Sequence, residues 1–331
     1  MKASPAPLAA LRPLLARFTG LRIAVWGDLV ADEFISGEIA RVSREAPVLI
    51  LKHTRRQVAL GGGANAAANL AALGIAVEVV GAAGDDEPGE RVREQLAAAG
   101  IGLRGWVRVP GRPTPTKTRI LAHHAHTLPQ QVVRVDREPE PLGRRWQARL
   151  AALAAQAARR CQAVLISDYG YGAATPAGAA RLRHQYPRAI IAVDARYQIA
   201  GYRGLTAATP NEAELEAALG RPARTPAELD RAGRGLRRRL ACDHLLITRG
   251  RDGMALIEAG RPLRMLPVHG SRQALDVTGA GDTVIAVFTA ALAAGASGEQ
   301  AATLANVAAG LVVMKPGTAT VSAGELEAAL G

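Results

Sequence analysis

The chain is poor in aromatic residues and cysteine, and it has no long apolar run. Phe, Trp and Tyr make up 3% of its 331 residues, so a large core must be built from aliphatic side chains and alanine. The two cysteines, Cys161 and Cys242, are too few for a zinc site and are typical of reduced thiols in a cytoplasmic protein. No apolar run reaches the roughly 20 residues that span a bilayer. The start of the chain also lacks the apolar segment and cleavage site of a secretory signal, so we expect a cytoplasmic protein without a membrane partner.

Lysine is scarce too, although the chain is strongly basic. The formal net charge of +12 makes nucleic acid a partner to consider. Arginine outnumbers lysine 37 to 4, however, and the arginines are scattered over expected helix faces, as in Arg144-Arg145 and Arg237-Arg238-Arg239. No nucleic-acid-reading motif is present. The excess charge is best explained by a compositional bias, and we expect no nucleic-acid partner.

Strand and helix patterns alternate along most of the chain. The length suits one large α/β domain, residues 1–331. Alternation of this kind predicts a mostly parallel central sheet with helices on both faces. Residues 8–18 read as an amphipathic helix ahead of it. The expected strands are 22–28, 76–81, 103–109, 163–167, 189–194, 205–209 and 244–248, with a hairpin at 253–267, and the expected helices are 61–73, 87–99, 143–158, 176–185, 211–219, 226–240, 279–295 and 298–313.

Two segments interrupt this alternation with β patterns and no helix signal. They cover about 33–60 and 111–136. Strands that are distant in sequence can pair, so we expect the two segments to form one small sheet beside the main domain. Such a discontinuous sheet would serve as a lid.

The most informative segment of the chain runs from Leu275 to Gly295. In it the turn Gly279-Ala280-Gly281 opens directly into an apolar helix. Unpaired amides at the positive end of a helix dipole make a site for a phosphate. Asp282 follows at once, where a carboxylate would repel that anion unless it accepts a proton from an attacking hydroxyl. A tight turn followed by a favourable first-turn acid is the plainer interpretation of an isolated G-x-G-D.

Other polar motifs stand at expected strand ends. Gly61-Gly62-Gly63-Ala64-Asn65 precedes a helix, and Thr209-Pro210-Asn211-Glu212-Ala213-Glu214 joins a strand to a helix, with Thr209 a candidate N-cap. Thr248-Arg249-Gly250 and Gly253 follow another buried strand. The chain contains no G-x-x-x-x-G-K-[ST], so a P-loop kinase is disfavoured.

Together these motifs resemble the ribokinase-like (PfkB) family of sugar and nucleoside kinases. The resemblance implies a ribokinase-like fold, with Asp282 as catalytic base and Gly279, Ala280 and Gly281 as the anion hole for the phosphoryl group of ATP. It implies that Gly62 and Gly63 hinge the lid and that Asn65 meets the sugar. Mg²⁺ would be held through water by Asn211 and Glu214. The segment around Asp276 and Thr278 would supply a K⁺ site in those members that use one. The residues expected to contact ATP are Asn211, Thr248, Arg249, Gly250, Gly253 and Asn306.

From about residue 20 onward, further strings resemble the heptose-phosphate kinases of lipopolysaccharide-precursor synthesis. These are Gly27-Asp28, 40–48, 113–121, 131–136, Ser167-Asp168-Tyr169-Gly170 and 315–322. The resemblance implies phosphorylation of the anomeric hydroxyl of D-glycero-D-manno-heptose 7-phosphate. Lid cations would hold the remote phosphate, and the lids of two subunits would pair in a homodimer. The expected substrate contacts are Asp28, Asp32, Asn65, Lys117, Arg119, Arg134, Asp136 and Asp168. Lys117 with Arg119, and Arg134 with Asp136, would share a strand face, as they also would on a merely solvent-exposed sheet.

Two departures from the pattern concern substrate choice. Tyr171 stands where Lys is expected in Asp-Tyr-x-Lys-Gly, and Asp194-Ala195-Arg196 replaces Asp-Pro-Lys. The chain ends where a fused cytidylyltransferase domain would begin in bifunctional relatives, so we expect the kinase part alone. Two alternatives remain open: a kinase for ribose, fructose or a nucleoside, and a non-catalytic sugar or nucleotide sensor.

Overall fold

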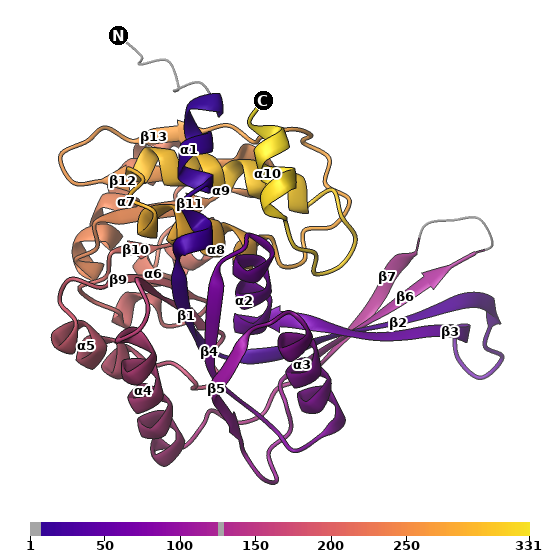
Figure 1. The fold of residues 1–331 in the computed structure, drawn as a ribbon. Coiled ribbons are helices and arrows are strands. Elements are labelled where there is room, and N and C mark those ends of the chain that lie inside the picture. The colour runs from indigo at the N-terminus through magenta and orange to yellow at the C-terminus, as the bar shows by residue number, and fades with distance from the viewer. Residues whose placement is uncertain (1–7, 125–128) are drawn as a thin grey trace.

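A nine-stranded sheet runs through the centre of the computed structural model, which describes residues 8–124 and 129–331 (Figure 1). The strand order is β13-β12-β11-β10-β9-β8-β1-β4-β5. The seven strands from β11 to β5 are parallel, while β12 and β13 add an antiparallel edge. The strands are β1 (Arg22–Gly27), β4 (Ala76–Ala83), β5 (Gly102–Arg108), β8 (Ala163–Asp168), β9 (Ile190–Ala195), β10 (Ala207–Ala208), β11 (His244–Thr248), β12 (Met254–Glu258) and β13 (Arg264–Leu266).

Helices cover both faces of this sheet, and each face has its own apolar core. Alternate residues of β1 divide between them: Ile23 and Val25 belong to one core, and Ala24 and Trp26 to the other. The first core also receives α1 (Arg12–Leu15), α2 (Gly63–Ala72), α3 (Glu87–Ala98), α8 (Ala280–Ala293), α9 (Gly298–Val312) and α10 (Ala323–Ala329). The second receives α4 (Arg144–Ala158), α5 (Pro176–Gln185), α6 (Glu212–Leu219) and α7 (Pro226–Leu240).

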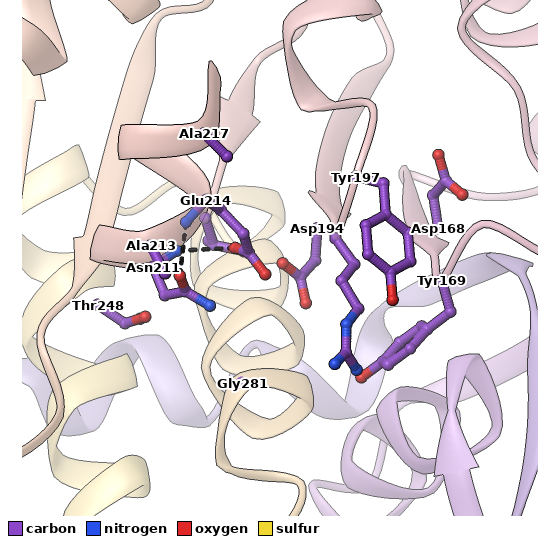
Figure 2. Close-up of a pocket in the computed structure, with 12 residues that line it drawn as sticks. Asp168, Tyr169, Asp194, Tyr197, Asn211, Ala213, Glu214, Ala217, Thr248 and Gly281 are labelled. Carbon is purple, nitrogen blue, oxygen red and sulfur yellow. Dashed lines mark hydrogen bonds between the residues drawn. The ribbon is translucent and has the colours of Figure 1, made fainter. Parts of the chain in front are cut away.

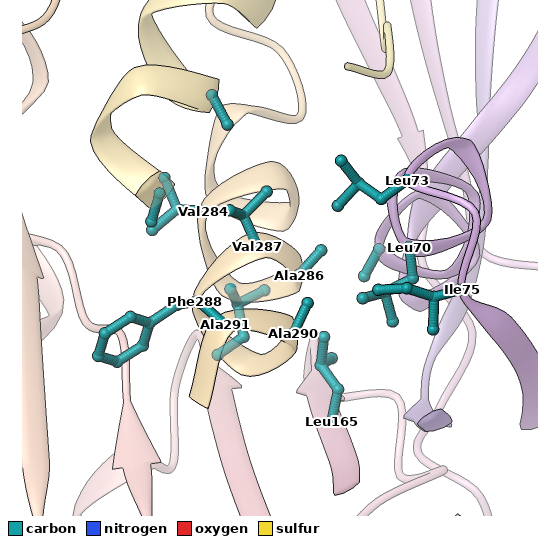
Figure 3. Close-up of a cluster of buried hydrophobic side chains, with 14 of the residues drawn as sticks. Leu70, Leu73, Ile75, Leu165, Val284, Ala286, Val287, Phe288, Ala290 and Ala291 are labelled. Atoms are coloured by element: carbon teal, nitrogen blue, oxygen red, sulfur yellow. The ribbon is translucent and has the colours of Figure 1, made fainter. Parts of the chain in front are cut away.

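Helix α8 is enclosed on all sides. Every residue from Asp282 to Leu292 is buried, so apolar contacts surround this helix instead of forming one stripe. Figure 3 shows Ala286 and Ala290 of α8 on the side of Leu70 of α2, with Phe288 directed to another side. This packing fixes where the N-terminus of α8 lies.

A second sheet projects from the body of the molecule (Figure 1). Its order is β3-β2-β6-β7, with β2 (Leu29–Val42), β3 (Leu49–Gly62), β6 (Thr116–His123) and β7 (Gln130–Arg137). The central pair β2–β6 is parallel and the two outer pairs are antiparallel. Only Asp28 separates β1 from β2, and β3 leads without a loop into α2.

The structure confirms the predicted fold class and the pairing of the two β segments into one sheet. Residues 125–128 of the second segment lie outside the described residues. The lid strands are longer than expected, because β2 begins at Leu29 and so includes Asp32. The strand predicted at 205–209 is reduced to Ala207–Ala208. No helix in the described part of the chain is long and apolar enough to cross a membrane.

Both ends of the described chain differ from expectation. Residues 8–18 form no continuous helix, because Pro13 lacks the amide that one would need there. Two short 3₁₀ turns, Leu8–Leu11 and Phe18–Gly20, flank α1 instead. Helix α10 was not predicted, although its start carries a capping box between Ser322 and Glu325 that is readable in the sequence.

Candidate active site

A cavity of about 530 Å³ opens at the carboxyl ends of the parallel strands (Figure 2). This is where ligands bind in open α/β sheets, because strand ends and helix starts converge there. Asp168 and Tyr169 reach the cavity from the end of β8, and Asp194 from β9. Thr209, Arg196, Tyr197, Asn211, Ala213, Glu214, Ala217, Thr248 and Gly281 complete its lining.

The start of α8 forms one wall of this cavity. Gly279 adopts a left-handed conformation with φ +78°, and no side chain caps the helix. A Cβ atom at Gly279 would lie 2.4 Å from Nδ2 of Asn65, so the turn requires glycine for space as well as for conformation. Ala280 N donates to the carbonyl of Val277 at 3.2 Å, so the other amides of this uncapped turn are the ones available to an anion.

Asp282 lies at this turn and is only 2% exposed. Asn65 Nδ2 donates to one of its carboxylate oxygens at 2.9 Å, and the Tyr169 hydroxyl donates to the other at 3.0 Å. Burial raises the pKa of Asp282 to about 7, although both hydrogen bonds lower it. A carboxylate with this pKa suits proton transfer near neutral pH.

Asn211 and Glu214 form a reciprocal capping box at the start of α6. The Asn211 side chain accepts from Glu214 N at 2.8 Å, and the Glu214 side chain accepts from Asn211 N at 2.9 Å. Asn211 is therefore the N-cap, and the expectation that Thr209 would fill this position is wrong. Capping alone accounts for both residues. It does not account for the Glu214 carboxylate facing Asp194 across the cavity (Figure 2).

Asp194 makes this side of the cavity strongly acidic. Burial raises the pKa of Asp194 well above its ordinary value, and the charge of Glu214 raises it further. Burial also raises the pKa of Glu214. The Thr209 hydroxyl is buried beside them. Oxygen donors of this kind suit a hard cation such as Mg²⁺, which takes few direct carboxylates and keeps its waters. No three His, Cys, Asp or Glu side chains of the described residues converge as a set of direct metal ligands.

A second, mostly apolar cavity of about 240 Å³ adjoins the first. Thr248 and Gly281 line both cavities. Gly250, Gly253 and Asn306 line the second one, with Asn306 donating to the carbonyl of Pro267 at 2.7 Å. The structure thus brings the expected nucleotide-binding residues together. Arg249 is the exception, because its guanidinium pairs with Glu212 at 2.8 Å and it lines neither cavity.

Asp28 lies beneath the site and not in its open space. Its carboxylate accepts backbone N–H groups of Tyr169, Tyr171 and Ala173 at 2.8, 3.0 and 2.9 Å. The side chain is 2% exposed, and burial raises its pKa to about 7. A carboxylate engaged in this way holds the loop after β8, which differs from the expected contact with sugar hydroxyls.

The glycines of the 61–65 block fit tightly against Asp28. Gly62 has φ +55°, and a Cβ there would lie 2.9 Å from the Asp28 carbonyl oxygen. Gly63 donates to that same oxygen at 2.9 Å. These contacts place Asn65, in the first turn of α2, against Asp282.

The charged residues of the lid are largely paired with one another. Arg119 of β6 forms a buried ion pair with Asp32 of β2. Arg134 pairs with Asp136 along β7 at 2.9 Å. Lys117 has no ion pair among the described residues, and its ammonium lies 4.7 Å from the ring centre of Tyr169. Burial lowers the pKa of Lys117. Of the three expected lid cations, Lys117 is the one whose charge is free for a ligand.

The two departures from the family motifs occupy different surroundings. The Tyr171 hydroxyl donates to Glu138 at 3.0 Å, and the residue does not line the main cavity. Arg196 does line it, next to Asp194. Nearby, Asp168 Oδ2 accepts from the Tyr202 hydroxyl at 2.8 Å and Oδ1 accepts from Gly170 N at 2.9 Å, so both of its oxygens are engaged.

The segment expected to bind a monovalent cation is held by the carboxylate of Asp276. That side chain accepts from Thr278 N at 2.9 Å and from Gly317 N at 2.8 Å. It thereby ties the turn before α8 to the loop near the C-terminus. The hydroxyl of Thr318, beside Gly279, is buried with no hydrogen-bond partner. An oxygen-rich turn with an unsatisfied hydroxyl is compatible with K⁺.

Three residues of this site, Tyr169, Asp194 and Arg196, stand in the motifs quoted from the sequence, but sequence reasoning assigned them no role in the site. Each follows or ends a buried strand, as Asp28 and Asp168 do. A polar residue at the end of a buried strand was the sequence signal that could have identified them. Which strand ends face the same cavity depends on the strand order, and the sequence does not provide this order.

Comparison with known proteins agrees with this geometry. Residues 22–323 match the family model described as pfkB family carbohydrate kinase. The "Bifunctional protein HldE" of Halorhodospira halophila is 42% identical over 322 residues, which cover 97% of this chain and 66% of that protein. The protein of the same name from Desulfatibacillum aliphaticivorans is 39% identical over 319 residues, covering 95% and 64%. The chain thus spans about two thirds of the length of these curated relatives.

Solved structures support the same fold. Arabidopsis thaliana ribokinase complexed with ribose and ATP superposes with a TM-score of 0.73 at 20% identity, covering 94% of this chain and 98% of that one. Phosphofructokinase-2 from Escherichia coli in complex with potassium gives a TM-score of 0.74 at 17% identity, with the same coverage. At these identities the likeness concerns the fold. Since the family model covers most of the chain, the protein belongs to the pfkB family of carbohydrate kinases.

Proposed function

We propose that this carbohydrate kinase transfers the γ-phosphoryl group of ATP to the anomeric hydroxyl of D-glycero-D-manno-heptose 7-phosphate. One observation carries the proposal. Asp282 is buried at the uncapped start of α8, between the acidic cavity of Asn211 and Glu214 on one side and Lys117 of the lid on the other. This arrangement supports a role for Asp282 as a base between a site for a nucleotide phosphate and a cation suited to a phosphorylated sugar.

In the proposed reaction, Asp282 accepts the proton of the attacking sugar hydroxyl. Asn65 and Tyr169 hold its two oxygens, so the carboxylate needs no reorientation as the proton moves. The amides of Gly279 and Gly281, which have no hydrogen-bond partner among the described residues, stabilise the negative charge that develops on the transferring group. Folding the lid over the cavity excludes water from this step.

The nucleotide lies across the two adjoining cavities in this proposal. Its base packs in the apolar cavity near Gly253 and Asn306, and its phosphates point toward Gly281. Asn211 and Glu214 would hold Mg²⁺ through water, which would supply positive charge beside the phosphates. The turn around Asp276 and Thr278 holds K⁺, supported by the unsatisfied hydroxyl of Thr318.

The sugar lies between Asp282 and the lid. Asp32 binds a sugar hydroxyl with the oxygen that Arg119 leaves free, Asp168 lies at the cavity with each oxygen already accepting one hydrogen bond, and Lys117 binds the remote phosphate. Arg119 and Arg134 contribute less than first expected because each is paired with an aspartate. Resemblance to heptose-phosphate kinases and the 39–42% identity to two bifunctional HldE proteins support the choice of sugar.

The lid also presents an apolar surface that we propose is covered by a second copy of the chain. Val42, Val48, Leu49, Val132, Val133 and Val135 are each at least 45% exposed on it. Isolated apolar residues are ordinary at a surface, but Val48, Leu49, Val132 and Val133 line one hollow of the lid, and a joined apolar patch is typical of an interface. Sedimentation of the protein and of a Val133→Asp variant tests this, and a monomeric wild type would contradict it. We place the reaction in the cytoplasm, where ATP and sugar phosphates are held.

A kinase screen tests the function. Heptose 7-phosphate, ribose, fructose, fructose 6-phosphate and a nucleoside are each offered with ATP and Mg²⁺, and ADP release is followed. The highest kcat/KM is expected for heptose 7-phosphate. A preference for an unphosphorylated sugar would overturn the choice of substrate, and the absence of turnover with every sugar would favour a sensor. Asp282→Asn is the control that separates this activity from a contaminating kinase.

A further inference from the structure

The loop after β8 is built around the carboxylate of Asp28. Three alternate amides, those of Tyr169, Tyr171 and Ala173, converge on it at 2.8–3.0 Å. The intervening Gly170 and Gly172 have φ +86° and +87°, which lets the chain turn its amides inward. Both glycines are also required for space, since a Cβ would lie 2.9 Å from the Tyr197 ring at one and 2.8 Å from Leu142 N at the other.

This loop conformation directs one side chain at the proposed base. The Tyr169 hydroxyl donates to Oδ1 of Asp282 at 3.0 Å, while Asn65 Nδ2 donates to Oδ2 at 2.9 Å. The two donors come from different elements, the loop after β8 and helix α2. Together they fix both the position and the rotation of the carboxylate. On the lid side, the ring of Tyr169 lies under the Lys117 ammonium at 4.7 Å.

We propose that Asp28 and Tyr169 form a positioning relay. Asp28 holds the loop after β8 in its conformation, and Tyr169 orients the carboxylate of Asp282 and favours its charged form. The inference rests on the proposed function of Asp282 as a base. Neither residue needs to touch the substrate for this role. Asp28 therefore belongs to the support of the base, in place of the sugar-hydroxyl contact expected from the sequence.

The Tyr169 hydrogen bond has a consequence for proton affinity that simple packing would not have. A donor to the charged carboxylate favours ionisation, so its removal raises the pKa of Asp282. The other groups that act on Asp282 come from the lid, from α2 and from the end of β9. They are Asp32 on β2, Lys117 on β6, Asn65 on α2 and Asp194 on β9. A change confined to the Tyr169 hydroxyl leaves all of them in place.

Tyr169→Phe removes this one hydroxyl and keeps the ring beneath Lys117. Tyr171→Phe is the matched control, because it removes a hydroxyl from the same loop that bonds to Glu138 instead of Asp282. For Tyr169→Phe, the acid limb of kcat/KM against pH should move up by about one pH unit, as the loss of a hydrogen bond to a charged group predicts. At pH 6.5 kcat should fall about tenfold, with KM for ATP unchanged. Tyr171→Phe should keep the wild-type midpoint.

A second measurement reports on Asp282 without turnover. Carboxyl ¹³C NMR of the full chain, with the Asp282 signal identified by its loss in Asp282→Asn, follows its titration directly. The midpoint should rise in Tyr169→Phe and stay in place in Tyr171→Phe. It should also rise in Asp28→Asn, where an amide group faces the loop N–H groups and weakens their hold on Tyr169.

The outcomes separate the relay from the proposed function. If the enzyme is active but Tyr169→Phe keeps the wild-type midpoint in both measurements, the relay is refuted and the kinase stands. Equal shifts in the two tyrosine variants would also refute it, since the effect would then come from the loop as a whole. If no sugar is phosphorylated, the function fails, and the NMR titration still decides whether Tyr169 controls the ionisation of Asp282.

Discussion

Replacing Asp282 by Asn should make the protein more stable at pH 8 while nearly abolishing its activity. Asp282 is 2% exposed, and its pKa of about 7 lies well above the ordinary 3.8. At 1.36 kcal/mol per pH unit, keeping the carboxylate ionised in the folded state costs about 4 kcal/mol. An amide avoids this cost but has only one acceptor oxygen, so one of the two hydrogen bonds to a charged carboxylate, from Asn65 or Tyr169, is lost or weakened, which costs about 1.5–3 kcal/mol. The net gain should be about 1–3 kcal/mol.

The gain must depend on pH in one direction. Between about pH 4 and 7 the folded state holds this proton more tightly than the unfolded state does, so wild-type stability falls as pH rises through this range. The advantage of Asp282→Asn should therefore be present at pH 8 and largely absent at pH 5. Urea melts of both proteins at the two pH values measure it. Asp243→Asn, at an exposed carboxylate, is the control and should show no such pattern.

The same variant tests catalysis. Loss of a general base typically costs about 10²–10⁴-fold in rate. The kcat of Asp282→Asn should fall by that factor, with the Kd for ATP nearly unchanged. A variant with near wild-type kcat, or one less stable than wild type at pH 8, would refute the argument that a buried base is maintained at the expense of stability.

Three further predictions concern the metal and the lid. Glu214→Gln should raise the Mg²⁺ concentration needed for half-maximal kcat, and a Mg²⁺ titration that overlays wild type would leave Glu214 with only its capping role. Lys117→Ala should raise KM for heptose 7-phosphate about 10–150-fold, the value of a charge-assisted hydrogen bond, and should leave KM for ATP and for free sugars unchanged. Arg119→Ala should act on stability, because it leaves the Asp32 carboxylate buried without its partner. Urea melts should show a free energy of unfolding lower by about 3–5 kcal/mol. The double variant Asp32→Asn/Arg119→Ala should recover much of this loss.

The sequence was sufficient to predict most strands and helices of the body and the position of Asp282 in the first turn of α8, because periodicity and glycine turns are local signals. It also predicted the two lid segments, whose β patterns break the alternation. The sequence did not reveal that Arg119 forms an ion pair with Asp32, because that pair depends on the parallel register between β2 and β6. Asp28 and Asp194 look alike in sequence, each at a strand end. One is enclosed by backbone amides and the other faces the cavity, and only the path of the following loop distinguishes them.

The junctions of the lid with the body lead to a mechanical consequence. β2 continues from β1 past the single residue Asp28, and β3 runs directly into α2. The lid therefore acts as a lever: its long arm is the projecting sheet, and its short arm is the first turn of α2, which carries Asn65. Its angle is thereby transmitted to Asp282 through one hydrogen bond. Residues inserted at these two roots would disconnect the lever from the base. The hairpin tip between Val42 and Leu49 lies at the far end of the long arm, so a change in its length should affect the proposed contact between subunits and leave the position of Asn65 unchanged.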